Sequence, residues 1–353
     1  DKTGQVPDAF WSGIDVRMLN LDLVPLEYGG AGNMNTVLRR ALISEQFGYA
    51  DPGLTLALPG PGLSMPPLVG IASEKQKEQV FSRFDTDRPC WGAFAITEPD
   101  AGSDATSISM TATKDGDDFI LNGEKCFITN GARADYIITF ATLDKSKGRF
   151  GIRAFIVDTD TPGFEVIRIE DMLGVRASQL ATLSFQNCRV PQENMLGFED
   201  GKIPVKDAFS GAQRSWDFMR PVLSSVIVGF CQAMADYLRN YVQCFPLGPH
   251  YKGNSSWIDE QLHAAEHRLN AGRLLCQQAA WKYDQGMFMS KDASLAKAYM
   301  SQIVMDIAQL LVKVAGPEGI SKSNIIEKWY RDAKVFDILE GTGDMQRLMI
   351  TKI

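Results

Sequence analysis

Hydrophobic and polar positions follow three successive patterns along the chain, and the first pattern is helical. Before about residue 88, apolar residues recur at near-helical spacing between turns, as in "NTVLRRALISEQFGYA". The stretches "EYGGAGN" and "PGPGLSMPP" are rich in glycine and proline and break this pattern. "SEKQKEQVFSRF" predicts a short helix capped by Ser73. We therefore expect an N-terminal helical domain over residues 1–89.

The second pattern, from about residue 90 to 197, has a period of two and predicts strands. Segments rich in Ile, Phe, Thr and Val alternate in this way: "CWGAFAIT", "FILNGEKCFIT", "DYIITFATL", "RAFIVDTD" and "LSFQNCRV". "KDGDDF" and "LNGEK" contain the residues of hairpin turns. We expect a middle β domain of about five to seven strands over residues 90–204.

The third pattern returns to helices, which are longer than those at the start. "WIDEQLHAAEHRLNAGRLLCQQAAWKYDQG" places its apolar residues near one face and should end at Gly286. "DASLAKAYMSQIVMDIAQLLVKVAG" should end in the same way at Gly316. A helical bundle is therefore expected over residues 205–353. Helices, then strands, then helices indicate an α+β fold with separated layers.

Composition and charge exclude several functional classes. The chain has 353 residues, 45% of them hydrophobic and 22% charged, which is typical of a soluble globular protein with more than one packed unit. A net charge of −7 argues against a nucleic-acid partner, which would require clustered Lys and Arg. No apolar run approaches the roughly 20 residues of a membrane span, so no span is predicted.

Cysteine and histidine spacing does not predict a disulfide framework or a metal site. The six cysteines are scattered without a C-x-x-C pair, which indicates a reducing compartment. His263 and His267 are four residues apart and could share a metal, but "HAAEH" lacks the Glu beside the first His that a zinc protease uses. We expect a surface or packing role for both. No G-x-S-x-G motif supports a hydrolase triad.

One carboxylate near the C-terminus lies between two apolar residues and a flexible turn. In "VFDILEGTGDM", Glu340 follows Ile338 and Leu339 and precedes Gly-Thr-Gly. A carboxylate in this position is either the N-cap of the final helix or a base kept away from water, where desolvation raises its pKa. The pattern alone is compatible with both.

Two turns in the β region have the composition of a ligand-binding edge. In "AFAITEPDAGSDAT" a strand ends at Thr97 and enters a turn with Gly102 and Ser103, whose small side chains would let backbone amides approach a phosphate or a ring. In "GEKCFITNG", Phe127 and Thr129 should share one strand face, which suits a flat heterocycle. A plain turn and a half-buried strand would look the same. Neither G-x-G-x-x-G nor G-K-[ST] occurs.

Four stretches in order resemble the acyl-CoA dehydrogenase family, closest to its medium-chain mitochondrial type and bacterial relatives: "AITEPDAGSD", "LNGEKCFITNG", "VRASQLATLSFQNCRVPQENMLG" and "RDAKVFDILEGTGDMQ". The resemblance covers nearly the whole chain. It implies an N-terminal helical domain, a middle β-barrel-like domain and a C-terminal four-helix bundle. It also implies an FAD enzyme that converts acyl-CoA, or an acyl carrier protein thioester, to the 2,3-trans-enoyl thioester. The implied electron acceptor is an electron-transferring flavoprotein, in the mitochondrial matrix or the bacterial cytoplasm.

The resemblance also implies roles for single residues. Glu340 matches the base that takes the α-proton while the β-hydrogen leaves as hydride to flavin N5. Asp217 and Arg220 in "WDFMRP" match a substrate-side pair, with an ordinary helix-surface residue as the alternative for Arg220. Ser103 matches a position near both the pyrophosphate and the thioester carrier. The positions that match flavin contacts are Phe94, Ile96, Thr97, Gly102, Ser103, Phe127, Thr129 and Thr342.

The chain departs from the family where one subunit usually grips the flavin of its neighbour. An E-R-x-x-F-G segment is replaced by "QCFPLGPHYKGN", with Phe245 in place of Arg, which should weaken binding by ~2 kcal/mol or more. An F-G-G-x-G-[FY] turn is replaced by "VAGPEGI", where Glu318 would repel a pyrophosphate. Asp344 replaces a common Gln. These losses favour a heteromer with a homologous subunit; a homo-oligomer, or a non-catalytic structural subunit of a larger complex, are the alternatives.

Overall fold

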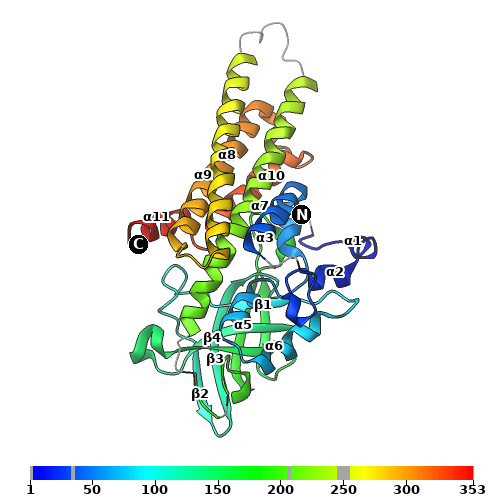
Figure 1. The fold of residues 1–353 in the computed structure, drawn as a ribbon. Helices are drawn as coiled ribbons and strands as arrows, with labels where there is room; N and C mark the ends of the chain where they lie inside the picture. The colour runs from blue at the N-terminus through cyan, green and yellow to red at the C-terminus, as the bar shows by residue number, and fades with distance from the viewer. Residues whose placement is uncertain (1–2, 33–35, 200, 205–207, 245–254, 353) are drawn as a thin grey trace.

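The computed structural model describes residues 3–32, 36–199, 201–204, 208–244 and 255–352, and its elements follow the predicted order. The sheet occupies one end of the molecule, and the long helices α7 (Ala208–Cys244) and α8 (Ser255–Asp284) extend away from it at the other end (Figure 1). Of the N-terminal helices, α3 (Val37–Ala50), α4 (Pro52–Ala57) and α5 (Met65–Ile71) pack against α7. The succession of helices, strands and helices predicted from the sequence is therefore confirmed.

The N-terminal region consists of short helices joined by 3-10 turns. The helices are α1 Asp8–Ser12, α2 Val16–Leu21, α3 Val37–Ala50, α4 Pro52–Ala57, α5 Met65–Ile71 and α6 Glu74–Phe81, and the turns are η1 Leu26–Tyr28, η2 Gly62–Ser64 and η3 Ser82–Phe84. The cap at Ser73 is confirmed: its Oγ accepts from the Gln76 amide at 3.3 Å, and Gln76 returns a bond at 2.9 Å. "PGPGLSMPP", expected to be a break, instead contains η2 and begins α5, because prolines fit a first helical turn.

The middle region is a sheet with strand order β1-β4-β2-β3-β7-β6, with β5 paired to β4, counted over the described residues. Its strands are β1 Gly92–Ala95, β2 Thr111–Asp115, β3 Asp118–Ile128, β4 Tyr136–Thr142, β5 Ile152–Asp158, β6 Phe164–Ile169 and β7 Ala181–Pro191. Short 3-10 turns lie between and after them: η4 Lys145–Gly151, η5 Arg176–Ser178 and η6 Gln192–Asn194. The sequence pattern identified five of the seven strands and missed β2 and β6.

One of the two predicted hairpin turns is wrong. "KDGDDF" does form the turn between β2 and β3, with Gly116 at φ 61°. "LNGEK", however, lies inside β3, where the pairing with β7 shifts register between Leu121 and Gly123. A Cβ on Gly123 would lie 2.8 Å from Met110, so this glycine permits a close approach between strands, not a reversal of the chain.

The C-terminal region contains the long helices. They are α7 Ala208–Cys244, α8 Ser255–Asp284, α9 Ser290–Ala315, α10 Ile325–Ile338 and α11 Gly343–Lys352, with the turn η8 Gly316–Ile320 after α9. Both predicted stops are confirmed, because Gly286 and Gly316 have φ of 66° and 59° just beyond the ends of α8 and α9. The packed faces of α7, α9 and α10 form one core.

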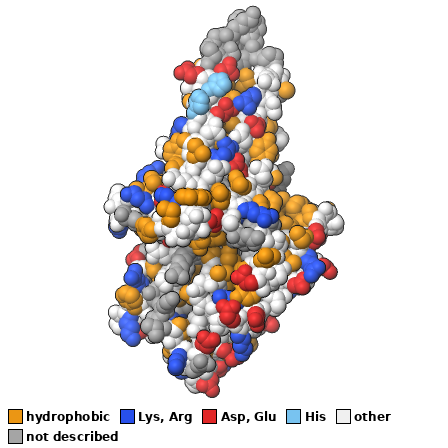
Figure 2. All heavy atoms as spheres, viewed as in Figure 1, with side chains coloured by type: hydrophobic (Ala, Val, Ile, Leu, Met, Phe, Trp, Pro, Cys, Tyr) orange, Lys and Arg blue, Asp and Glu red, His pale blue; other side chains and the backbone are white. Residues whose placement is uncertain are grey.

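Among the described residues, α7 is the one helix long and apolar enough to cross a membrane by length and composition, but 89% of its apolar window is buried inside the protein. It packs against α3, α8 and α9 as a core helix. All six cysteines are free thiols. His263 and His267 are exposed on α8, in the helical end of the surface (Figure 2), and His250 lies outside the described residues. The described part holds no cluster of three potential metal ligands.

Candidate active site

Hydrogen bonds bring together the two segments of the β region that were predicted to bind a ligand, "AFAITEPDAGSDAT" and "GEKCFITNG". The Cys126 amide donates to the Thr97 carbonyl at 3.0 Å, and Lys125 Nζ donates to the Ile96 carbonyl at 3.0 Å. The turn after β1 therefore lies directly beside the end of β3. Thr97 and Phe127, which are 30 positions apart in the numbering, become neighbours at one edge.

A buried ion pair fixes this edge, and the sequence reasoning missed it. Lys125 Nζ lies 2.8 Å from Glu98 Oε1, and Glu98 also accepts from the Ser109 amide at 2.6 Å and the Met110 amide at 3.0 Å. Burial lowers the pKa of Lys125 to about 8, against the opposing effect of Glu98. Glu98 and Lys125 lie in the two motifs identified from the sequence as ligand-binding candidates. A charged residue within a buried strand requires a partner, so the position of Lys125 could have predicted this ion pair.

A bulge changes how Phe127 and Thr129 are presented. Their expected common face relied on strict alternation, but the β3–β7 register shifts between Lys125 and Ile128, and Phe127 has φ 56°. The strand ends at Ile128, so Thr129 lies beyond it and is half-buried. The Phe127 ring is 54% exposed, a large free apolar surface at this edge.

Of the other residues in the β region that were predicted to contact a flavin, two are buried and two lie in an open turn. Phe94 and Ile96 are 9% and 5% exposed, and Phe94 packs against Phe140 with ring centroids 5.0 Å apart. These two side chains therefore belong mainly to the core. Ser103 is exposed, and nothing lies within 4 Å of where a Cβ would project from Gly102. The structure leaves this turn open.

Glu340 lies in the turn between α10 and α11, with a backbone φ of 59°. The N-cap alternative is wrong, because Thr342 Oγ1 accepts from the Met345 amide at 3.2 Å and so caps α11. Gln346 Nε2 donates to the Glu340 carbonyl at 3.0 Å and to the Gly341 carbonyl at 3.4 Å. The Glu340 carboxylate is thus free for another role.

One oxygen of the Glu340 carboxylate is buried and has no partner in the described part of the chain. The residue as a whole keeps some exposed surface, yet its Oε2 atom is buried and has no hydrogen-bond partner among the described residues. Burial raises the pKa of Glu340 to about 7, while the positive charges of Arg220 and Lys297 act to lower it. Glu340 Oε2 is therefore a buried carboxylate oxygen that no described residue pairs with.

Asp217 and Arg220 form a buried pair on α7. Arg220 is 8% exposed, so the helix-surface alternative is wrong. Arg220 Nη1 lies 3.6 Å from Asp217 Oδ1, and Asp217 Oδ2 accepts from Ser290 Oγ at 2.6 Å. Burial raises the pKa of Asp217 and lowers the pKa of Arg220. Arg220 Nε is buried and has no hydrogen bond in the described part of the chain.

A third charged residue, Lys297 of α9, was not identified from the sequence. It is fully buried, and its Nζ donates to Ser301 Oγ and to the Phe336 carbonyl, both at 2.8 Å. Burial lowers the pKa of Lys297 to about 8. Its place among the apolar residues of "ASLAKAYM" was the signal, because a lysine on a buried helix face needs acceptors.

One loop ties the sheet edge to the helix that carries Glu340. The Asn130 amide, next to Thr129, donates to the Ser178 carbonyl at 2.8 Å. The Val175 amide, in the same loop, donates to Asp332 Oδ1 of α10 at 2.6 Å. Among the described residues no hydrogen bond joins Glu340 directly to the sheet candidates, so this loop sets their relative placement.

Comparison with known proteins identifies the arrangement. Models of the N-terminal, middle and C-terminal domains of acyl-CoA dehydrogenases match residues 1–85, 93–188 and 209–353. The chain belongs to the acyl-CoA dehydrogenase family.

Acyl-CoA dehydrogenases of short-chain specificity are among its relatives. The short-chain specific enzyme of Megasphaera elsdenii is 37% identical over 330 residues, which cover 92% of this chain and 84% of the relative. The mitochondrial short-chain specific enzyme of Rattus norvegicus is 34% identical over 340 residues, covering 95% and 79%. The structure of butyryl-CoA dehydrogenase from Megasphaera elsdenii has a TM-score of 0.87 at 31% identity and covers 100% and 91%. These names differ from the medium-chain type that the sequence motifs suggested.

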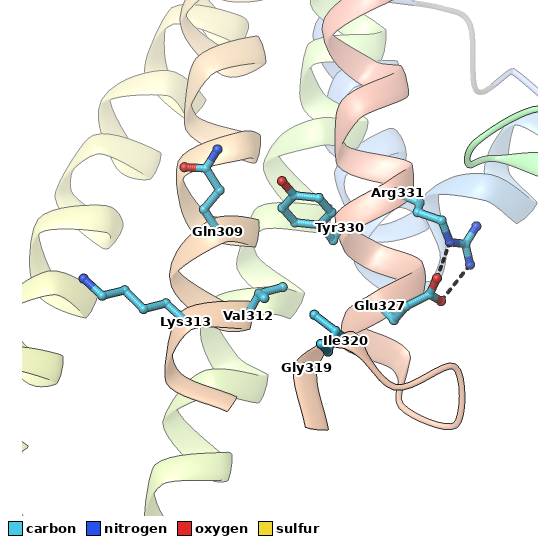
Figure 3. A pocket seen from close by; sticks show the side chains of 8 residues that line it. All are labelled: Gln309, Val312, Lys313, Gly319, Ile320, Glu327, Tyr330 and Arg331. Carbon is cyan, nitrogen blue, oxygen red and sulfur yellow. Dashed lines mark hydrogen bonds and ion pairs between the residues drawn. The ribbon is translucent and has the colours of Figure 1, made fainter. Parts of the chain in front are cut away.

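Membership makes the chain an oxidoreductase and confirms the predicted family fold. Two hollows in the described part of the chain lie away from Glu340. One, of about 330 Å³, lies between α5 and the start of α7. The other, of about 410 Å³, lies between α9, η8 and α10 (Figure 3) and is lined by Gln309, Val312, Lys313, Gly319, Ile320, Glu327, Tyr330 and Arg331.

The second hollow borders the turn η8, which corresponds to "VAGPEGI" in the sequence. Gly319 packs closely on α9, because a Cβ there would lie 3.1 Å from Val312. The Glu318 carboxylate accepts from the Tyr241 hydroxyl at 2.9 Å, which ties the turn to α7. Phe245 lies outside the described residues. Asp344 is exposed and pairs with Arg347 at 2.8 Å.

Proposed function

We propose that this chain is an FAD-dependent acyl-thioester α,β-dehydrogenase in which Glu340 removes the α-proton. The observation that carries the proposal is the buried, unpaired Oε2 of Glu340. A carboxyl with a pKa of about 7 is substantially ionised at neutral pH and is basic enough to take a weakly acidic proton. Because Oε2 has no hydrogen bond among the described residues, it can accept the proton without first breaking one.

The residues at the sheet edge fit FAD. No described residue hydrogen-bonds to the side-chain hydroxyls of Thr97, Ser103 or Thr129, and the Phe127 ring offers free apolar surface. Free hydroxyls beside an aromatic ring suit a flat, polar heterocycle. Thr97, Thr129 and Phe127 would hold the ring system, with contributions from Phe94 and Ile96; Gly102, Ser103 and Thr342 would hold the pyrophosphate. When bound, FAD supplies the acceptor for the β-hydrogen as hydride.

The protein side of the reaction is proton removal in a dry site. Glu340 Oε2 takes the proton from the α-carbon and keeps it until the product leaves. Arg220 and Lys297 favour the ionised carboxylate before the transfer, since both act to lower its pKa. Ser103, Asp217 and Arg220 contribute to substrate binding. Burial excludes water, which would otherwise solvate the carboxylate and weaken it as a base.

The substrate is an acyl-CoA, and short acyl chains are the first to test because the relatives named above are short-chain specific and butyryl-CoA enzymes. An acyl carrier protein thioester is the second carrier to test. Electrons pass to an electron-transferring flavoprotein. The proposed compartment is the mitochondrial matrix or the bacterial cytoplasm, as the rat and bacterial relatives suggest.

For the assembly, we propose a heteromer with a homologous subunit. Glu318 and Pro317 stand in the turn that family members lend to a neighbouring flavin. The Glu318 carboxylate accepts from the Tyr241 hydroxyl at 2.9 Å, which holds it in this turn. A carboxylate beside a pyrophosphate would weaken its binding. The alternatives are a homo-oligomer and a non-catalytic structural subunit.

Dye reduction by acyl-CoA thioesters tests the catalytic proposal. Glu340→Gln should lower kcat by about 10² to 10⁴-fold, since general-base catalysis contributes that much. Glu78→Gln, an exposed carboxylate on α6, should leave the rate unchanged. A Glu340→Gln variant with the wild-type rate would exclude Glu340 as the base. A wild type that is inert with every carrier and partner would favour the structural subunit.

A further inference from the structure

A buried lysine lies beneath the turn that carries Glu340, with neutral oxygens as its partners. Lys297 Nζ donates to Ser301 Oγ at 2.8 Å, to the Phe336 carbonyl at 2.8 Å and to the Asp337 carbonyl at 3.4 Å. None of its described hydrogen bonds goes to a carboxylate. A buried ammonium is costly unless it is paired, so its retention in this place needs a reason.

The bonds of Lys297 fix the end of the helix that leads to Glu340. Phe336 and Asp337 belong to the last turn of α10, whose final carbonyls have no partners within the helix. A cation that binds these carbonyls also interacts favourably with the helix dipole. Three residues later, Glu340 adopts φ 59°, a left-handed conformation that costs free energy for a residue with a Cβ. Such a turn persists only where its surroundings hold it.

The turn is held from its other side as well. Gln346 of α11 donates to the carbonyls of Glu340 and Gly341. Gly343 brings α11 against the lysine site: a Cβ there would lie 2.8 Å from Asp337 Oδ1 and 3.7 Å from the Ser301 Cβ. The strained turn therefore lies between the Lys297 ammonium and the Gln346 amide.

We propose that Lys297 is a positioning residue for Glu340: its ammonium clamps the end of α10 so that the carboxylate enters the buried site. This inference rests on the proposed function, in which Glu340 is the base. Lys297 does not touch the substrate. It acts through the backbone of Phe336 and Asp337 and through its charge.

The charge effect of Lys297 can be separated from its neighbours. The charged groups around the turn come from four helices: Asp217 and Arg220 on α7, Lys297 on α9, Lys334 and Asp337 on α10, and Asp344 and Arg347 on α11. Arg220 and Lys297 act directly on Glu340. Because Arg220 keeps its charge when Lys297 is replaced, the change should shift the titration of Glu340 without abolishing it.

The first test measures the titration of Glu340 without substrate. Lys297→Met removes the charge at similar length, and Lys297→Gln removes the charge but keeps a donor for the carbonyls and guards against misfolding of the first variant. The thermal-unfolding midpoint of each is followed against pH beside the same protein with Glu340→Gln. The two members of a pair diverge above the unfolded-state pKa, and the pH at which their difference stops growing reports the ionisation of Glu340 in the folded protein. That pH should rise by about one unit in both variants. Lys334→Met, an exposed lysine on α10, is the matched control and should not move it.

The second test measures acyl-thioester turnover against pH. At pH 7, kcat should fall about fivefold in Lys297→Met and Lys297→Gln, because less of Glu340 is ionised, and the loss should disappear above pH 9. If Glu340 titrates at the wild-type pH in both variants, the proposal is overturned. If the wild type itself shows no turnover, the proposed function fails, while the unfolding experiment still decides whether Lys297 controls Glu340.

Discussion

At the scale of single residues, Glu340 is subject to two opposing influences. Burial disfavours its charge, and the nearby cations Arg220 and Lys297 favour it. Burial is the larger effect, which leaves the carboxyl titrating near neutral pH instead of near 4.5. A base in this range is strong enough to remove a proton and still ionised often enough to act. The same burial means that the ionised Glu340 lowers the free energy of unfolding of the protein.

This cost predicts that Glu340→Gln stabilises the protein in a pH-dependent way. Because the pKa of Glu340 is raised on folding, the free energy of unfolding contains a contribution that is fully present below the unfolded pKa of about 4.5 and is lost as pH rises through about 7. At pH 8 the variant should therefore be more stable than the wild type by up to roughly 3 kcal/mol. Near pH 4 the two should be alike. Urea unfolding at both pH values measures the difference, with Glu78→Gln as the control; equal stabilities at pH 8 would contradict it.

What the sequence revealed about single residues depends on how local their partners are. Glu340 stood out because its apolar neighbours and Gly-Thr-Gly are adjacent in the chain. That Glu340 does not cap α11 could be seen only from the Thr342 hydrogen bond, which depends on the folded structure. Lys297 stayed hidden because its acceptor, the Phe336 carbonyl, lies 39 positions further on. Burial of Arg220 likewise depends on packing between helices.

At the scale of elements, the edge formed by β1 and β3 depends on the Lys125–Glu98 pair. Glu98 follows β1 and Lys125 lies within β3, so their bond holds the open turn against the strand. The amides of Ser109 and Met110 add to the same carboxylate. This pair thus orders the backbone around Thr97 and Phe127, where FAD is proposed to bind.

Removal of one partner of this pair should be more harmful than removal of both. Glu98→Leu leaves a buried ammonium without a carboxylate and should destabilise the protein by about 3 to 5 kcal/mol. The double variant Glu98→Leu with Lys125→Met removes both charges and should be less destabilised than Glu98→Leu alone. Urea unfolding of the singles and the double measures the coupling. Strictly additive losses would show that the pair contributes nothing beyond its separate residues.

Elements with local signals were predicted, and those defined by distant pairing were not. Ser73 and Gly316 mark helix ends by chemistry within a few residues, so α6 and α9 were found. β6 was missed because most of its side chains are exposed, so apolar alternation is weak. The bulge at Phe127 arises from the register between β3 and β7 and leaves no trace in the order of residues.

At the scale of the whole molecule, the candidate site depends on contacts between the sheet and the helices. The loop that contains Val175 and Ser178 bonds to the end of β3 on one side and to Asp332 of α10 on the other. Asp332 is fully buried and also accepts from Lys328 at 2.8 Å. The order of the regions could be read from periodicity, but this connection could not, because its partners are 157 positions apart.

Flavin content is the property of the whole assembly that tests the proposed heteromer. Glu318 and Pro317 lie in η8, the turn proposed above to lack the contacts for a neighbouring flavin, and Glu318 is held there by Tyr241. We expect the chain purified alone to retain less than one FAD per chain and to gain flavin when co-expressed with a homologous subunit.

The double change Pro317→Gly with Glu318→Gly restores glycine and removes a charge, so it should raise the flavin content of the chain alone. Asp344→Gln, which changes an exposed carboxylate outside this turn, separates the loss of a charge from the repair of the turn. Absorbance at the flavin band against protein mass measures all of these, and a homodimer with one FAD per chain would show that no second kind of subunit is required.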